Sequence, residues 1–330
     1  MGFLGLFGPN VEKLRRKGDA LGLVIAMRDP NVREEAGAAL LSLGEAALPA
    51  ALAGMRDAEG HADEHDQILV SAAVQAGAAA VEPVMQLAAE GSDQAKRRAL
   101  TALGRLGDRR AVPAIRSALR ESTDWVRSSA LNALVALTGR EDVDVVMESL
   151  SDSSALVKNE AARLLGQVGD PAAIPALRSL WGQVGSLDLT TATADRVEGL
   201  LGRDVAIEDP QARLMMAAWR RSVFFFNIAG SLAVLGDAGA REALFSAVRK
   251  TDSPGSRLNA IEQLGRLGGE AAMVLLAEAL RDPDKNVRWE AIKALGATPD
   301  PNGSRMLEQA RGAASWDDRE RIAKALARRG

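Results

Sequence analysis

The stretch Ala99-Leu100-Thr101-Ala102-Leu103-Gly104-Arg105-Leu106-Gly107-Asp108 decides the fold, because closely related stretches return along the whole chain. Residues 161–170 and 260–269 repeat its order of alanine, leucine and glycine. One apolar anchor position recurs every 30 to 33 residues, apart from a single interval of 67. The anchors are Ala36, Leu69, Ala99, Ala130, Ala161, Ile228, Ala260, Ala291 and Ile322. A period of this length predicts stacked structural repeats.

Each repeat is predicted to contain two helices. The first follows an Asp or Ser, as at Asp29-Pro30 and Asp282-Pro283, because such side chains cap the free N–H groups of a helix. Alanine and leucine then recur at three- and four-residue spacing, and a glycine ends the helix by accepting positive φ. The second helix follows at once with an early proline, which a first turn tolerates. These prolines are Pro49, Pro83, Pro113 and Pro175.

The Asp-Pro-x-x-Val-Arg openings, the Ala-x-x-Ala-Leu-Gly-x-Leu-Gly-Asp centres and the Ala-x-x-Pro-Ala-Leu second helices resemble the HEAT-repeat family. The resemblance is to the short bacterial and archaeal type named after phycobilisome lyase repeats, and it extends from about Asn10 to Gly330. It implies an all-α fold, a right-handed α-solenoid of about nine two-helix repeats whose second helices line the concave face. It also implies a scaffold or binding surface, since only a few members are enzymes or lyase subunits.

We expect a single solenoid domain over residues 1–330, with capping half-repeats at both ends. Residues 1–28 would form the N-terminal cap, and residues 315–330 a capping helix with a polar outer side. The long interval makes residues 182–221 either an insertion or a degenerate repeat. Large apolar side chains gather around it and would either fill the gap in the stack or form a binding patch. They are Trp181, Met215, Met216, Trp219, Phe224, Phe225 and Phe226.

The composition argues against most classes of enzyme. The 330 residues include no cysteine and two histidines, which excludes thiolate nucleophiles, sulfur metal sites and multi-histidine centres. His61 and His65 lie four residues apart, but no third histidine exists to complete a usual metal site. The family resemblance also raises deoxyhypusine hydroxylase, which binds iron through His-Glu pairs, and this chain has no His-Glu dipeptide. We therefore expect no catalytic residue, no metal and no cofactor.

Basic side chains recur at one position of the repeats, with an acid three to five residues before most of them. We interpret this pattern as a structural ladder of ion pairs along the first helices, in which each exposed pair contributes little. The basic members are Arg33, Lys96, Arg127, Lys158, Arg257, Arg288 and Arg319.

The third repeat has a stronger basic character, with nine basic and four acidic residues between positions 92 and 127. Arg109, Arg116 and Arg120 share one face of its second helix, and Arg178 aligns with Arg116. The alignment places this stripe toward the concave side, either as a solvated face or as a site for carboxylate or phosphate groups. The candidate partner-binding residues are Arg105, Arg109, Arg116, Arg120, Arg178, Trp181, Trp219 and Phe225.

The sequence thus favours a non-enzymatic scaffold that binds a protein or peptide in its concave groove, through an acidic or phosphate-bearing segment of the partner. The alternative is a nucleic-acid-binding solenoid that uses the basic third repeat, although the net charge of −3 opposes it. An accessory subunit of a bilin lyase is a weaker alternative that rests on the family name alone. The opening apolar residues lack a basic region and stop at Pro9, so we expect a cytoplasmic protein without membrane contact.

Overall fold

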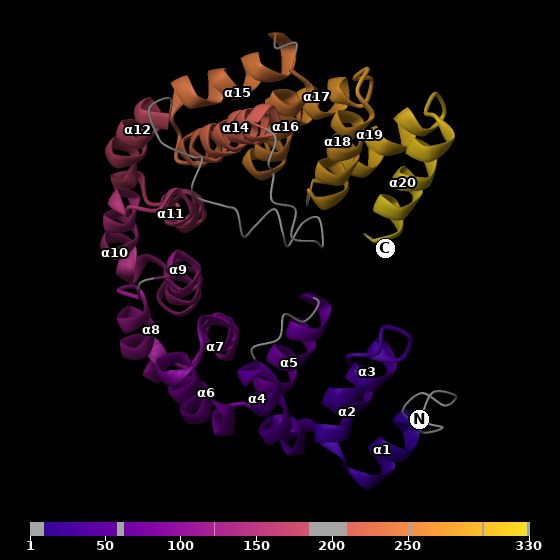
Figure 1. Ribbon diagram of the computed structural model, residues 1–330. Helices are drawn as coiled ribbons and strands as arrows, with labels where there is room; N and C mark the ends of the chain where they lie inside the picture. Colours follow the sequence, from indigo (N-terminus) through magenta and orange to yellow (C-terminus); the bar gives the residue numbers. More distant parts are fainter. Residues whose placement is uncertain are drawn as a thin grey trace. The chain divides into compact units, whose positions relative to one another are not determined.

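The computed structural model describes residues 10–57, 63–121, 123–184, 210–250, 253–298 and 300–328. All regular elements within these ranges are helical, which confirms the all-α prediction (Figure 1). The chain divides into two compact units, Met1–Val143 and Asp144–Gly330. In each unit the helices pack as successive pairs, the arrangement of an α-solenoid.

Unit 1 holds nine α-helices among its described residues. They are α1 (Val11–Lys17), α2 (Ala20–Ala26), α3 (Arg33–Ser42), α4 (Leu48–Arg56), α5 (Asp63–Gln75), α6 (Ala78–Glu90), α7 (Asp93–Leu106), α8 (Val112–Ala118) and α9 (Asp124–Thr138). Three 3₁₀ turns join them: η1 (Gly44–Ala47), η2 (Arg109–Ala111) and η3 (Gly139–Asp142).

The helices of unit 2 follow the same alternation. They are α10 (Val143–Glu148, which begins at the boundary), α11 (Ala155–Val168), α12 (Ile174–Gln183), α14 (Pro210–Val234), α15 (Ala238–Lys250), α16 (Pro254–Leu267), α17 (Gly269–Ala279), α18 (Lys285–Ala297), α19 (Pro301–Arg311) and α20 (Trp316–Ala327). The turns η4 (Ser149–Ser151) and η5 (Pro171–Ala173) precede α11 and α12. None of the described helices is long and apolar enough to span a membrane.

The anchor positions read from the sequence form the centre of the core. Each of the nine, from Ala36 to Ile322, is at most 1% exposed. They all lie on the first helices of the repeats, most of which bury leucines as well. The 31-residue period therefore predicted the core correctly.

The helix ends agree with the prediction at most positions. Gly107 and Gly169 end α7 and α11 with φ of 70° and 74°, as a left-handed C-cap requires. The N-cap of α18 is Asp284 and not Asp282, because the helix begins two residues later than the motif suggested. The expectation for Pro83 is wrong, since it lies inside α6. The other prolines follow a 3₁₀ turn, whereas α6 begins as an α-helix one turn earlier.

The first helices of successive repeats pack more closely than the second helices do. Glycine makes this approach possible. A Cβ atom on Gly104 would lie 3.1 Å from the Cα atom of Ala133, and one on Gly166 would lie 2.8 Å from the Cα atom of Ser231. Gly265 and Gly296 meet Ala294 and Ala325 in the same way. Small residues at these crossings thus set the spacing of the stack.

This packing corrects the expected placement of the two rows. Figure 1 shows α5, α7 and α9 on the inner side of the curve of unit 1, with α6 and α8 on its outer side. In unit 2 the inner row is α11, α14, α16 and α18. The row whose helices approach most closely lies on the inside of a curve. The first helices therefore line the inner face of each unit, and the second helices do not.

The recurring basic residues are structural, but their partners differ from the expected ones. Arg127 and Arg288 donate to the carbonyl groups of Glu121 and Asp282, six residues earlier, at 2.9 and 3.0 Å. These carbonyls follow the end of the preceding second helix, where a cation is favourable. Arg33 and Arg319 do the same with Met27 and Ala314. Carboxylates 25 to 30 residues further along the chain complete the ladder, as in the pairs Lys96–Glu121, Arg257–Asp282 and Arg288–Asp318.

The 67-residue interval between the anchors Ala161 and Ile228 includes the connection from α12 to α14. It does not interrupt the inner row, which continues from α11 to α14. α11 packs directly on α14, where the amide of Asn227 donates to Asn159 at 2.9 Å. No described helix stands between them, and residues 182–221 remain either an insertion or a degenerate repeat. α14 contains 25 residues. Its last part is the expected first helix, and residues 210–221 extend it toward its N-terminus. Residues 185–209 lie outside the described ranges.

The joint between α18 and α20 depends on one buried carboxylate. Asp318, 5% exposed, accepts hydrogen bonds from Ser315, Arg288 and Trp289 at 2.8 to 2.9 Å. The guanidinium of Arg321 stacks on the ring of Trp289, 3.7 Å from its centroid. Residues 315–328 thus supply the predicted C-terminal helix, docked through polar contacts.

We expect the docking of α20 to weaken in acid. Burial alone would raise the pKa of Asp318, but the hydrogen bond from Ser315 and the contacts of Arg288 outweigh it and lower that pKa. The stabilisation is therefore complete above the unfolded pKa of about 4 and is lost as pH falls through the folded value. Urea midpoints of unit 2 measured at descending pH should show this loss. Asp318→Asn should be less stable at neutral pH and should lose less on acidification, and an unchanged pH profile would contradict this assignment.

Candidate functional site

The predicted arginine stripe of the third repeat lies on the outer row and is largely neutralised. Arg109 pairs with Glu141, and Arg116 pairs with Asp142, both from η3 of the next repeat. The hydrogen bond from Arg109 lowers the pKa of Glu141. Arg120 is exposed just after α8, and no polar partner is found for it within the described residues. The stripe therefore does not lie on the inner face where the sequence placed it.

Arg178 repeats the role of Arg116, as their alignment suggested. Its Nε atom lies 2.5 Å from Oδ2 of Asp237, which is 2% exposed. The same carboxylate accepts the backbone N–H of Ala240 at 2.9 Å and so caps α15. That backbone bond lowers the pKa of Asp237, burial opposes the change, and Arg178 adds to the lowering. Arg116 and Arg178 thus hold neighbouring repeats together along the outer row.

The aromatic candidates separate into a packed group and an exposed residue. The ring of Phe225 lies 5.1 Å from that of Trp181 and 5.2 Å from that of Phe226. Phe224 and Phe226 are 3% and 6% exposed, as the gap-filling interpretation requires. Trp219 lies on the N-terminal extension of α14 and is 47% exposed. Met215 and Met216 belong to α14, but their side chains lie outside the described ones.

Arg105 is the predicted arginine that does lie on an inner face. On α5, α7 and α9, the solvent-facing residues of the inner side form a stripe of neutral and basic groups. We call this the inner stripe, and it consists of Gln67, Ser71, Gln75, Arg97, Thr101, Arg105, Ser129, Asn132 and Ala136. Between Gln67 and Ala136 it carries two arginines and no carboxylate, whereas Glu64, three residues before Gln67 on α5, is 77% exposed and lies 3.6 Å from Arg33 of α3. The stripe is bounded on one side by α3, which begins with Glu34 and Glu35.

The two arginines of the inner stripe are held without strong neutralisation. Nη2 of Arg105 donates to the hydroxyl of Ser71 at 3.2 Å, a contact with a neutral group that orients the side chain. Nη2 of Arg97 is 3.8 Å from Asp66, but that carboxylate is engaged at 2.8 Å by the buried Arg98. The hydroxyl of Thr101, between them, donates to the carbonyl of Arg97. The planar guanidinium groups remain able to bind carboxylate or phosphate oxygens.

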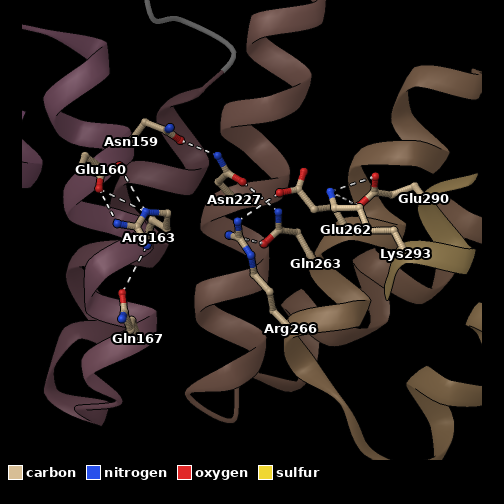
Figure 2. A network of polar contacts seen from close by, with 10 residues as sticks. All are labelled: Asn159, Glu160, Arg163, Gln167, Asn227, Glu262, Gln263, Arg266, Glu290 and Lys293. Atoms are coloured by element: carbon tan, nitrogen blue, oxygen red, sulfur yellow. Dashed lines mark hydrogen bonds and ion pairs between the residues drawn. The ribbon is translucent and has the colours of Figure 1, made fainter. Parts of the chain in front are cut away.

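The inner face of unit 2 has a different electrostatic character (Figure 2). Its cations pair with carboxylates three or four residues away on the same helix, as in Glu160–Arg163, Glu262–Arg266 and Glu290–Lys293. A chain of side-chain amides crosses three helices, from Gln263 through Asn227 to Asn159, with N–O distances of 2.9 Å. Figure 2 shows these groups turned toward one another, so the cations that it draws have carboxylate or amide partners close by.

Sequence reasoning missed Arg97 because it assigned the basic cluster to the second helix. The distinguishing signal was present, since Arg97, Thr101 and Arg105 are spaced four apart on the first helix. The histidine motif contributes no visible site. His65 is buried at 1% exposed, and His61 lies outside the described residues. Over the described ranges, no group of three His, Cys, Asp or Glu side chains is placed to hold a metal ion.

Several solved structures resemble this chain in architecture. The complex of CpcE and CpcF of phycocyanin lyase from Nostoc matches with 18% identity and a TM-score of 0.46, covering 81% of this chain and 94% of that one. Human deoxyhypusine hydroxylase matches with 22% identity and a TM-score of 0.32, over 86% and 96% of the two chains. The Kap95:Nup1 complex gives 15% identity and a TM-score of 0.46, over 99% and 51%. Likeness at these levels says nothing about activity.

Comparison with curated proteins finds no significant match. The family model for HEAT repeats matches residues 81–160, 126–185 and 241–327, which together make up more than half of the chain. These ranges contain six of the nine anchors and the helix pairs described above. The chain therefore belongs to the HEAT-repeat family.

Proposed function

We propose that this protein is a non-enzymatic scaffold that binds an anionic segment of a partner protein on the inner face of unit 1. The observation that supports the proposal is the inner stripe of α5, α7 and α9, whose nine residues include Arg97 and Arg105 and no carboxylate. Glu64, which precedes the stripe on α5, lies 3.6 Å from the guanidinium of Arg33. Its other members are hydroxyl, amide and alanine side chains, which form hydrogen bonds or leave room for a partner. HEAT repeats generally bind proteins, which supports this class of function.

The outer row is less suited to the same role. Three arginines of the outer row already form ion pairs with carboxylates of the adjacent repeat: Arg109, Arg116 and Arg178. An incoming anionic group would have to displace these carboxylates, two of which are fixed at 5% and 2% exposure. Among the described residues, the one partner found for the guanidinium of Arg105 is the hydroxyl of Ser71, a neutral group. This bonding pattern supports Arg105 as the proposed partner-binding residue, and it fits a role for Arg116 and Arg178 in the stacking of repeats.

Binding of labelled probes to the purified protein tests the proposal. A glutamate-rich peptide should bind at low salt, and its affinity should fall as ionic strength rises. Arg105→Glu should weaken it about tenfold, since a charge-assisted hydrogen bond contributes roughly 1.5–3 kcal/mol. Arg116→Glu is the matched control on the outer row and should change the affinity less than about twofold.

Further probes separate the sources of anionic charge. A phosphoserine peptide that binds while the glutamate peptide does not would assign the site to phosphate. Binding of duplex or single-stranded DNA that Arg105→Glu weakens, without peptide binding, would replace the proposal with nucleic-acid recognition. Failure of every probe to respond to Arg105→Glu would contradict the assignment of this surface.

A further inference from the structure

The spacing of Arg97 and Arg105 restricts the partner that can reach both of them. They are eight residues apart on α7, and a helix rises about 1.5 Å per residue, so their Cα atoms are roughly 12 Å apart along the axis. Thr101 lies between them on the same face and contributes no charge. Two anionic groups on one partner must match this distance to engage both guanidinium groups.

The separation corresponds to different sequence spacings in different partner conformations. An extended segment advances about 3.3 Å per residue, so groups four residues apart span roughly 13 Å. In a helix the same distance needs eight residues, because each adds only about 1.5 Å. The spacing of the two acidic residues in the peptide that binds most tightly therefore indicates whether the bound segment is extended or helical.

The chemistry of the inner stripe favours the extended form. A helix that docks on a protein surface usually buries an apolar face against it. The large apolar side chains that are exposed in the described ranges are Leu21, Ile25, Trp219, Val234, Val274 and Trp316, and none belongs to α5, α7 or α9. The stripe offers the side chains of Ser71, Thr101, Ser129 and Asn132 instead, which suit the polar backbone of an extended chain.

We infer that the inner stripe of unit 1 recognises an extended partner segment that carries two acidic residues four positions apart, one for each of Arg97 and Arg105. This inference rests on the proposed function and specifies its ligand. Arg105, oriented by Ser71, binds one acidic group bidentately. Arg97 binds the other, and its contact with Asp66 at 3.8 Å is long enough to yield.

Four peptides test the inference by fluorescence anisotropy with the full chain. Two are extended and rich in threonine and valine, with glutamates four or two positions apart. Two are alanine-rich and helical, with glutamates eight or four positions apart. The extended peptide with a spacing of four should bind about tenfold more tightly than the other three. Only this peptide brings both glutamates to the two arginines without placing a helix face against the polar inner stripe. Arg97→Gln should remove that advantage and leave the weaker peptides unchanged.

The possible outcomes separate the inference from the proposed function. If the helical peptide with a spacing of eight binds best, the partner segment is a helix and the inference is wrong. If all four peptides bind equally and Arg105→Glu weakens all of them, the spacing rule is wrong while the anionic site stands. If Arg105→Glu affects none of them, the proposed function itself fails.

Discussion

Gly166→Leu is expected to destabilise unit 2 by about 3 kcal/mol or more, at the upper end of overpacking effects. A Cβ atom at position 166 would lie 2.6 Å from the Oγ atom and 2.8 Å from the Cα atom of Ser231. Because the second of these is a backbone atom in the last turn of α14, no side-chain rotation relieves the contact. The two inner-row helices must separate, and the hydrogen bond between Asn159 and Asn227 breaks with them.

Urea denaturation and hydrogen exchange measure this effect. The loss of protection should be concentrated in α11 and α14, since a repeat contacts mainly its neighbours. Gly182→Leu is the matched control, because nothing lies within 4 Å of a Cβ atom placed there on α12. It should be neutral or slightly stabilising, since leucine is the better helix former. Equal destabilisation by both variants would show that close packing of the inner row is not what these glycines provide.

Replacement of Arg98 by methionine should cost unit 1 about 3–5 kcal/mol, the range for breaking a buried ion pair. Arg98 is 2% exposed and lies at the meeting point of three helices. Its Nη1 atom donates to the carbonyls of Met55 and Asp57, at the end of α4. Its Nη2 atom lies 2.8 Å from the carboxylate of Asp66 on α5. Methionine fills the volume, but it leaves both carbonyls without their donor and Asp66 without its ion-pair partner.

The neighbouring arginine is the control for this second prediction. Arg97→Met removes the same functional group from a side chain that is 35% exposed and should cost less than about 1 kcal/mol. Arg98→Lys keeps the charge without the forked geometry and should fall between the two. A loss for Arg98→Met no larger than that for Arg97→Met, in urea titrations of the purified proteins, would show that the buried contacts are weak.

The fold was predictable from the sequence because its determinants are local and repeated. The anchors, the C-terminal glycines and most of the prolines have the same role in every repeat, so one aligned stretch predicted nearly all of the helices. The faces were harder to assign. Which row lies inside the curve depends on how closely helices of different repeats approach, and the crossing of Gly166 with Ser231 joins residues far apart in the sequence.

The candidate site was predictable in composition and not in position. The excess of arginine between residues 92 and 127 was visible, but sequence alone did not show that Glu141 neutralises Arg109 or that Asp142 neutralises Arg116. Those pairs join separate repeats and depend on the stacking geometry. The same geometry places the hydroxyl of Ser71, and no carboxylate of the described residues, against the guanidinium of Arg105, which no count of charges along the chain could show.

The central claim is that the inner face of unit 1, and not its outer row, receives the anionic partner segment. Charge reversal of one pair of arginines on each side tests it most directly. The affinity of a labelled extended peptide with two glutamates is measured for Arg97→Glu/Arg105→Glu and for Arg109→Glu/Arg116→Glu, with helical circular dichroism as the check on folding. We predict that the inner pair loses more than about tenfold in affinity while the outer pair stays within about threefold. A loss confined to the outer pair, with the inner pair binding like the unmodified protein, would contradict the account.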